Sequence, residues 1–135
     1  MTKLKELMSV SGLPGLYRMV ANKSNGLIAE DLDTGKRKFL SLRKHQFSPL
    51  ETIAIFTHLD SVPLMDVLQK MRAIQADIPP IKPNSSNDEL RAYFLKVLPD
   101  HDDSRVFPRD IKKIIKWFNF LQERNLLNDP SDEEE

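Results

Sequence analysis

The chain has 135 residues, of which 40% are hydrophobic and 30% charged, and this composition is typical of a globular protein rather than a disordered chain. Its net charge of zero argues against a protein that mainly coats nucleic acid, and no apolar run approaches the ~20 residues of a membrane span. The absence of cysteine excludes disulfides, thiolate metal sites and thiol nucleophiles, and it favours a cytoplasmic location.

The first half of the chain predicts mainly β-strands. Three apolar side chains at helical spacing in residues 3–9 predict a short helix, which a turn rich in glycine and proline ends. Alternating side chains and tight turns, one of them at Asn25-Gly26 where positive φ is expected, predict an antiparallel meander at residues 15–21, 27–32 and 37–42. Residues 52–57 are rich in β-branched and aromatic side chains and predict a fourth strand.

The second half predicts helices. Residues 63–75 carry an apolar stripe and predict a helix that covers the sheet. Residues 77–85 contain three prolines and predict an extended linker between two domains. Residues 86–127 predict a helical hairpin that begins at a capping box, and residues 128–135 predict a disordered acidic tail.

The expected fold class is therefore α+β. Residues 1–76 are expected to form a small SH3-like antiparallel barrel or curved sheet with flanking helices, because four short strands joined by tight turns favour such structures. The helical hairpin follows as a second part. Each part is small, so the two are expected to pack on one another or on a partner.

Several motifs resemble those of a family of uncharacterised proteins from Bacteroidetes-type bacteria. The similar segments are SVSGLPGLY at residues 9–17, DSVPL at 60–64, VLPDHD at 97–102, RVF at 105–107, DIKKI at 110–114 and WFN at 117–119. The chain departs from the family pattern at Leu13, at His101 and at Pro108-Arg109. The resemblance implies a small β-barrel domain joined to a helical domain, both without an assigned function.

The strongest candidate binding surface is a basic segment at residues 36–45. Residues 34–45 carry five positive charges and no acid, on Lys36, Arg37, Lys38, Arg43 and Lys44. Small barrels bind single-stranded nucleic acid with basic edges and stacking aromatics, and Phe39 lies within the segment. The alternative interpretation is protection of an edge strand, because lysines there discourage pairing between sheets.

A second candidate surface lies on the last helix. Lys113 and Lys116 lie beside Trp117 and predict a basic face that contacts phosphates or an acidic partner, although a solvated helix face explains them equally. The apolar arc that includes Trp117 is broader than one neighbouring helix requires. It therefore predicts a contact with the β-rich half or a homodimer.

Catalytic and metal sites are not expected. The acidic turn at residues 100–104 has alternating oxygen ligands, but Arg105 and Ile111 stand where a calcium loop needs glycine and glutamate. The turn is instead expected to use Arg105 to neutralise nearby aspartates. The three histidines lack metal-binding spacing, and neither a phosphate loop nor a nucleophile elbow is present, so no cofactor is expected.

The function that these observations favour is that of a non-catalytic binding or adaptor protein with a protein partner or a second copy of itself. An alternative is weak binding of single-stranded nucleic acid through the basic segment. A further alternative is a regulatory subunit of an enzyme on another chain.

Overall fold

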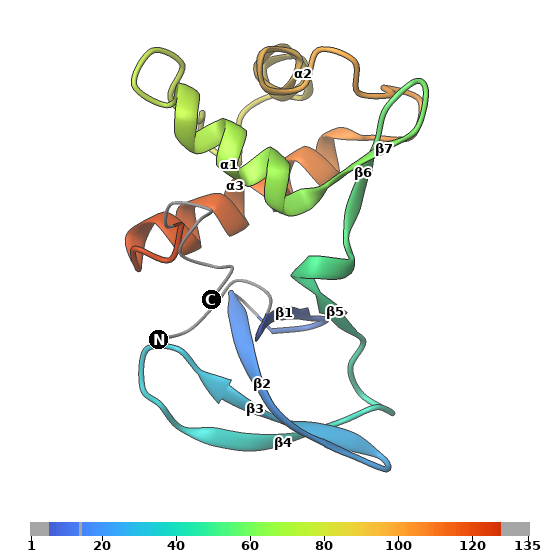
Figure 1. Ribbon diagram of the computed structural model, residues 1–135, viewed down its shortest axis with the longest axis vertical. Helices are drawn as coiled ribbons and strands as arrows, with labels where there is room; N and C mark the ends of the chain where they lie inside the picture. The colour runs from blue at the N-terminus through green and yellow to red at the C-terminus, as the bar shows by residue number, and fades with distance from the viewer. Residues whose placement is uncertain (1–5, 14, 128–135) are drawn as a thin grey trace. The chain divides into compact units, whose positions relative to one another are not determined.

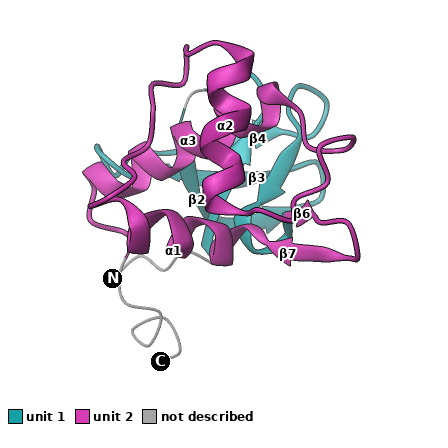
Figure 2. Ribbon diagram, turned by 90° about the horizontal axis from the view of Figure 1, so that it is seen from above, with its two compact units in different colours: residues 1–53 teal, residues 54–135 magenta. Residues whose placement is uncertain are grey.

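The computed structural model describes residues 6–13 and 15–127, and the chain divides into two compact units, residues 1–53 and residues 54–135. Figure 1 shows the order of the elements, and Figure 2 distinguishes the two units by colour. The first unit contains a five-stranded antiparallel sheet, and the second contains a two-stranded sheet and three α-helices. The predicted α+β class is confirmed.

The sheet of the first unit has the strand order β4-β3-β2-β1-β5, and every neighbouring pair is antiparallel. Its strands are β1 (Leu7–Val10), β2 (Leu16–Lys23), β3 (Gly26–Asp31), β4 (Arg37–Ser41) and β5 (Phe47–Pro49). The register shifts within β2 between Met19 and Ala21, and such a bulge bends and twists a strand. Among the described residues, β4 and β5 form the two ends of an open sheet.

The meander predicted in the first half is confirmed. It could be predicted because alternating side chains and turn residues act between near neighbours in the chain. In the turn between β3 and β4, the carboxylate of Asp31 accepts hydrogen bonds from the amides of Asp33 and Thr34, at 2.8 and 3.1 Å. Gly35 follows with a φ of 73°, a conformation that glycine adopts without strain. The apolar sides of these strands form one core, composed of Met8, Val10, Tyr17, Leu27, Ala29 and Leu40.

Gly26 was expected to lie in a turn with positive φ, but its role in the structure is different. It is the first residue of β3, it pairs with Ser41, and the positive-φ residues do not include it. A Cβ atom at this position would collide with the carbonyl oxygen of Leu40 and lie 2.7 Å from the Phe39 ring. Glycine is therefore required by the close approach of β4.

The helix predicted at residues 3–9 is wrong for the residues that the structure describes. Residues 7–10 form β1, which lies between β2 and β5. Pairing on both sides satisfies the strand's backbone groups, and Leu7, Met8 and Val10 are at most 1% exposed. A few apolar residues at helical spacing are too short a pattern to resist this non-local pairing.

The strand predicted at residues 52–57 is also placed differently. The fifth strand of the first sheet is β5, which carries Pro49 at the sheet edge, where proline is tolerated. Leu50–Thr52 form a short 3₁₀ turn, labelled η2. Strand β6 (Ala54–Phe56) then pairs with β7 (Ser61–Pro63) in a separate two-stranded sheet.

The second unit is built around α1 (Leu64–Ile74), α2 (Asn87–Val97) and α3 (Pro108–Glu123), each of which contacts the other two. Their periodic apolar residues are buried together, and the largest fully buried side chains are Phe94 and Phe118. The predicted capping box is present, since the Ser86 hydroxyl accepts from the Glu89 amide at 3.2 Å and the Glu89 carboxylate accepts from the Ser86 amide at 3.2 Å. None of the helices within the described residues is both long and apolar enough to cross a membrane.

The division between the units lies at residues 53 and 54, before the helix that was expected to cover the sheet. That helix, α1, contacts β7, α2 and α3 within the second unit. The proline-rich segment at residues 77–85 forms neither helix nor strand and joins α1 to α2. The predicted acidic tail at residues 128–135 lies outside the described residues.

Candidate partner-binding edge

The basic segment that the sequence singled out contains β4, the edge strand of the first sheet. β4 pairs with β3 on one side, through a register that places Phe39 opposite Ile28 and Lys38 opposite Ala29. Its other side has no neighbouring strand among the described residues. An edge strand presents backbone donors and acceptors that are free to pair with another chain.

The hydrogen bonds at the two ends of β4 show which residues face this open side. The Asp31 amide donates to the Lys36 carbonyl oxygen at 2.9 Å, and the Leu42 amide donates to the Asn25 carbonyl oxygen at 3.0 Å. In an antiparallel ladder, residues that bond to the neighbouring strand alternate with residues whose backbone groups point away. Even-numbered residues of β4 therefore bond to β3, and the amides and carbonyls of Arg37 and Phe39 face outward.

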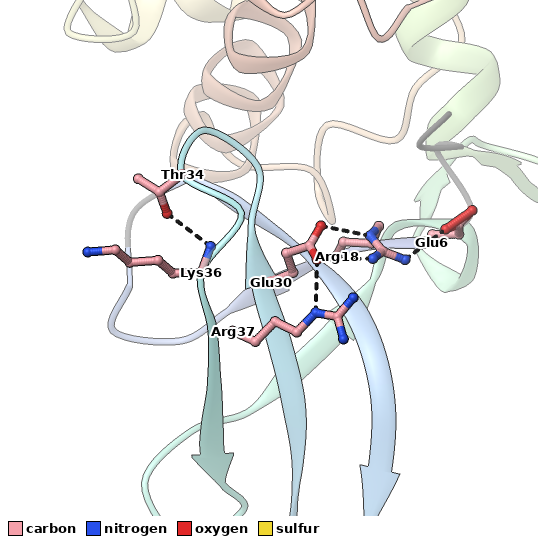
Figure 3. Close-up of polar contacts among 6 residues, drawn as sticks. All are labelled: Glu6, Arg18, Glu30, Thr34, Lys36 and Arg37. Atoms are coloured by element: carbon pink, nitrogen blue, oxygen red, sulfur yellow. Dashed lines mark hydrogen bonds and ion pairs between the residues drawn. The ribbon is translucent and has the colours of Figure 1, made fainter.

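One of the basic side chains belongs to an ion-pair ladder across three strands (Figure 3). Glu30 on β3 accepts two hydrogen bonds from Arg18 on β2, at 3.1 and 3.2 Å, and one from Arg37 on β4, at 3.1 Å. Arg18 also lies 3.6 Å from a carboxylate oxygen of Glu6. The hydrogen bonds from Arg18, and then the one from Arg37, hold the pKa of Glu30 below its usual value. Arg37 is therefore already neutralised within the protein.

The other four cations of the segment have no carboxylate partner among the described residues. Lys36 and Lys38 lie on β4 and its entry, and Arg43 and Lys44 lie in the turn that follows. The Lys38 ammonium lies 5.5 Å from the centre of the Tyr17 ring, a cation–π distance. Within the part of the chain that the structure describes, the edge thus carries four positive charges without a carboxylate counterion.

Apolar side chains are exposed beside these cations. Phe39 is 46% exposed and Leu42 is 57% exposed, and both lie between the two groups of basic residues. The Phe39 ring also covers Gly26 of the neighbouring strand. The edge therefore offers charge, apolar surface and unpaired backbone groups within a few residues.

The second predicted group lies in the other unit. Lys113 and Lys116 are exposed on α3, and Trp117 is half-buried beside them. This group and the basic segment belong to different compact units. Ile111, Ile114 and Ile115 of the same helix are buried, as the amphipathic pattern predicted.

The acidic turn has the role that its capping residues predicted. The Asp102 carboxylate accepts hydrogen bonds from the amide and hydroxyl of Ser104, at 3.0 and 2.6 Å, and from Arg105 at 2.9 Å. These bonds, first the one from the Ser104 hydroxyl, lower the pKa of Asp102 to about 2. Within the described residues, no group of three or more histidine, cysteine, aspartate or glutamate side chains has the arrangement of a metal site.

Two of the three histidines, His45 and His101, contact backbone carbonyl oxygens through their rings. His45 of the first unit lies with its Nδ1 2.9 Å from the carbonyl oxygen of Ser11. His101 of the second unit is 2% exposed, and its Nδ1 lies 2.8 Å from the carbonyl oxygen of Leu98. Because a carbonyl oxygen only accepts hydrogen bonds, both Nδ1 atoms carry the proton. The buried ring of His101 packs edge-on against Phe94, with 4.8 Å between centroids.

Sequence reasoning identified the basic residues but missed two features of the edge. The ladder of Arg18, Glu30 and Arg37 needs the register of three strands, although strand alternation places each of them on a polar side. The outward direction of the Arg37 and Phe39 backbone groups needs the hydrogen-bond pattern of β3 and β4. The composition of the segment predicts neither feature.

The comparisons with known proteins agree with the division into two units. Residues 4–50 match the family described as Domain of unknown function (DUF5606), and residues 53–121 match Domain of unknown function (DUF6852). The chain is similar to a protein from Bacteroides vulgatus whose solution NMR structure was determined by a structural genomics consortium. That similarity has 36% identity and a TM-score of 0.75, and covers 93% of this chain and 89% of that one. No curated protein matches the chain.

The match to one of these domains spans just over half of the chain, and the similar protein comes from a Bacteroides species. Both findings agree with the motifs recognised in the sequence. The chain therefore belongs to an uncharacterised Bacteroidetes-type family and contains both domains of unknown function.

Proposed function

We propose that this protein is a non-catalytic binding or adaptor protein whose first unit recognises an acidic protein partner at the β4 edge. The observation that carries the proposal is the group of four cations, Lys36, Lys38, Arg43 and Lys44, without carboxylate partners among the described residues. Complementary charge speeds the encounter of two proteins and selects between partners. The exposed side chains of Phe39 and Leu42 add apolar contact area beside the charges.

The experiment compares binding of polyglutamate with binding of a single-stranded oligonucleotide. Fluorescence anisotropy at ~50 and ~200 mM salt measures both affinities. We expect polyglutamate to bind, and to bind more weakly at the higher salt concentration because its charges are screened. Lys36→Glu with Lys38→Glu should weaken binding by about tenfold or more. The matched control, Lys70→Glu with Lys96→Glu, makes the same change of charge on exposed helix positions of the second unit and should leave the affinity unchanged.

Single-stranded nucleic acid is the second candidate ligand for the same edge. It is favoured by one observation, the partly exposed ring of Phe39 between cations, because bases stack on such rings. Tight binding of an oligothymidylate of about 16 nucleotides without binding of polyglutamate would replace the first proposal with this one. Absence of binding to both polymers at ~50 mM salt would refute the edge as a binding site for either.

Other parts of the proposal concern architecture and context. The return of β5 to pair with β1, next to a bent β2, supports an SH3-like arrangement of the first sheet.

Trp117 on α3 supports a second contact, to a partner or to another copy of the chain, and either a regulatory subunit or a homodimer would use it. The absence of cysteine supports a cytoplasmic location. Analytical ultracentrifugation of wild-type protein and Trp117→Ala tests the homodimer, which predicts a dimer that the substitution weakens.

A further inference from the structure

Among the strands at the ends of the two sheets, β4 has the least protected edge within the described residues. The edge strands β5 and β7 have three residues each and contain Pro49 and Pro63, which lack an amide donor. The second side of β6 is covered at its C-terminal end, because the His58 amide donates to the Asp100 carbonyl oxygen at 3.1 Å and the Asp102 amide donates to the Phe56 carbonyl oxygen at 2.9 Å. β4 has five residues, no proline and no such cover among the described residues.

We propose that this edge binds an extended acidic peptide segment of a partner protein by adding it to the sheet as a sixth strand beside β4. The inference rests on the proposed function and specifies the mode of recognition. Arg37 and Phe39 direct two amides and two carbonyls outward, so an added strand forms up to four backbone hydrogen bonds with them. Recognition by strand addition obtains affinity from the main chain and specificity from alternate side chains.

The side chains of β4 define the pattern that the added strand requires. Lys36 and Lys38 are two residues apart and lie on one face of the sheet, while Arg37 and Phe39 lie on the other. Side chains directly opposite on neighbouring strands are in contact distance. The preferred segment therefore has acidic residues at two alternate positions, beside Lys36 and Lys38, and an apolar residue beside the exposed Phe39.

Charge selects an acidic strand over the other candidates. A second copy of the same edge would place Lys36 and Lys38 against like charges, which disfavours β4–β4 pairing of two copies. Arg37 is held by Glu30 at 3.1 Å and directs its charge along the ladder rather than toward the edge. The lysines thus repel a basic or self-similar strand and attract an acidic one.

The test uses a fluorescent peptide of about six residues that alternates glutamate and valine, with a lysine–valine peptide as the control. We expect the first peptide to bind the full chain and the second to show no binding. Methylation of single peptide amides is then scanned along the acidic peptide. Because only every second amide of an added strand faces β4, methylation should weaken binding by about tenfold at alternate positions and have little effect at those between.

Two variants of the protein test the same edge by changing β4 rather than the peptide. Phe39→Pro removes an outward amide without removing a hydrogen bond to β3, and it should abolish peptide binding. Phe39→Ala removes the ring but keeps the amide, so it should retain part of the affinity. Circular dichroism reports whether each variant keeps its fold, and the methylation scan does not depend on either variant.

The outcomes separate this inference from the proposed function. Binding of the acidic peptide that is equally sensitive, or equally insensitive, to methylation at every position would overturn strand addition while leaving an acidic partner in place. Failure of both polyglutamate and the acidic peptide to bind would overturn both, and would leave Lys36 and Lys38 as protection against aggregation. Binding of the oligonucleotide alone would assign the edge to nucleic acid.

Discussion

The two units treat the edges of their sheets in opposite ways. In the second unit, residues 100–102 cover the C-terminal end of β6, where Thr57 and His101 form a bridge and are 4% and 2% exposed. In the first unit, the outer side of β4 is uncovered within the described residues and is bordered by lysines. A protein that covers one strand edge with its own chain and leaves a longer one open concentrates its capacity for backbone pairing at a single place. The proposed function therefore assigns recognition to the first unit.

The largest expected effect tests the core of the second unit. Phe94→Ala should lower the free energy of unfolding by about 4 kcal/mol, because the ring is fully buried on α2 and packs against His101. Urea unfolding followed by circular dichroism measures the change. The neighbouring substitution Leu95→Ala is the control, because Leu95 is 52% exposed and should lose little. Similar losses for the two variants would contradict the assigned helix faces.

The next effect tests the close approach of β3 and β4. Gly26→Ala should destabilise the protein by about 3 kcal/mol, because the new methyl group would press on the Leu40 carbonyl oxygen and the Phe39 ring. Gly35→Ala, where φ is 73° and the surroundings are open, should cost only about 1 kcal/mol through backbone strain. Thermal unfolding ranks the two variants, and a larger loss for Gly35→Ala would contradict the packing of the β4 edge.

A smaller effect with the opposite sign is expected at Tyr93 on α2. Its side chain is 4% exposed, its hydroxyl has no hydrogen-bond partner among the described residues, and burial raises its pKa to about 12. Tyr93→Phe removes the unpaired hydroxyl, so it should stabilise the protein by about 1 kcal/mol. A loss of stability on chemical unfolding would show that the hydroxyl is paired in solution.

The pKa of Tyr93 gives a second measurement on the same residue. Since the folded value lies above the usual 10.0, the neutral side chain favours folding, and this contribution is lost as the pH rises from about 10 through about 12. Tyr93→Phe should therefore be less sensitive than the wild-type protein to alkaline pH. If the midpoints of unfolding of the variant and the wild-type protein fell equally as the pH rose, the burial of the hydroxyl would be contradicted.

The smallest effect concerns the acidic turn beside the covered edge. The pKa of Asp102 is lowered to about 2, so its charged form favours the folded state. This contribution is present above the ordinary aspartate pKa of 3.8 and is lost as the pH falls through about 2. Asp102→Asn should show a smaller fall in Tm than the wild-type protein between these pH values. Parallel curves would indicate that the hydrogen bonds from Ser104 and Arg105 do not persist in solution.

The sequence predicted the parts of the fold that depend on near neighbours. Helices α2 and α3 follow from their periodic apolar residues, the Ser86 capping box and Pro108, and the meander of β2, β3 and β4 follows from alternation and turns. β1 and β5 were not predicted, because they are defined by pairing with residues far along the chain, such as Met8 with Pro49. Local sequence patterns do not indicate which distant residues will pair.

The candidate site follows the same division. The sequence identified the five cations of the basic segment, because charge is a property of single residues. It did not separate Arg37, which Glu30 neutralises, from Lys36 and Lys38, because that distinction requires the register of β3 and β4. The outward backbone of Arg37 and Phe39 follows only from the hydrogen bonds at both ends of the strand.

Amide hydrogen exchange along β4, measured by NMR, tests the open edge most directly. The amides of Lys38 and Leu40 should exchange slowly because they bond to β3, while those of Arg37 and Phe39 should exchange at nearly the rate of an unfolded chain. Adding the glutamate–valine peptide should slow exchange at Arg37 and Phe39 alone. Slow exchange at Arg37 and Phe39 in the free protein would contradict the account, because their backbone groups would already have partners.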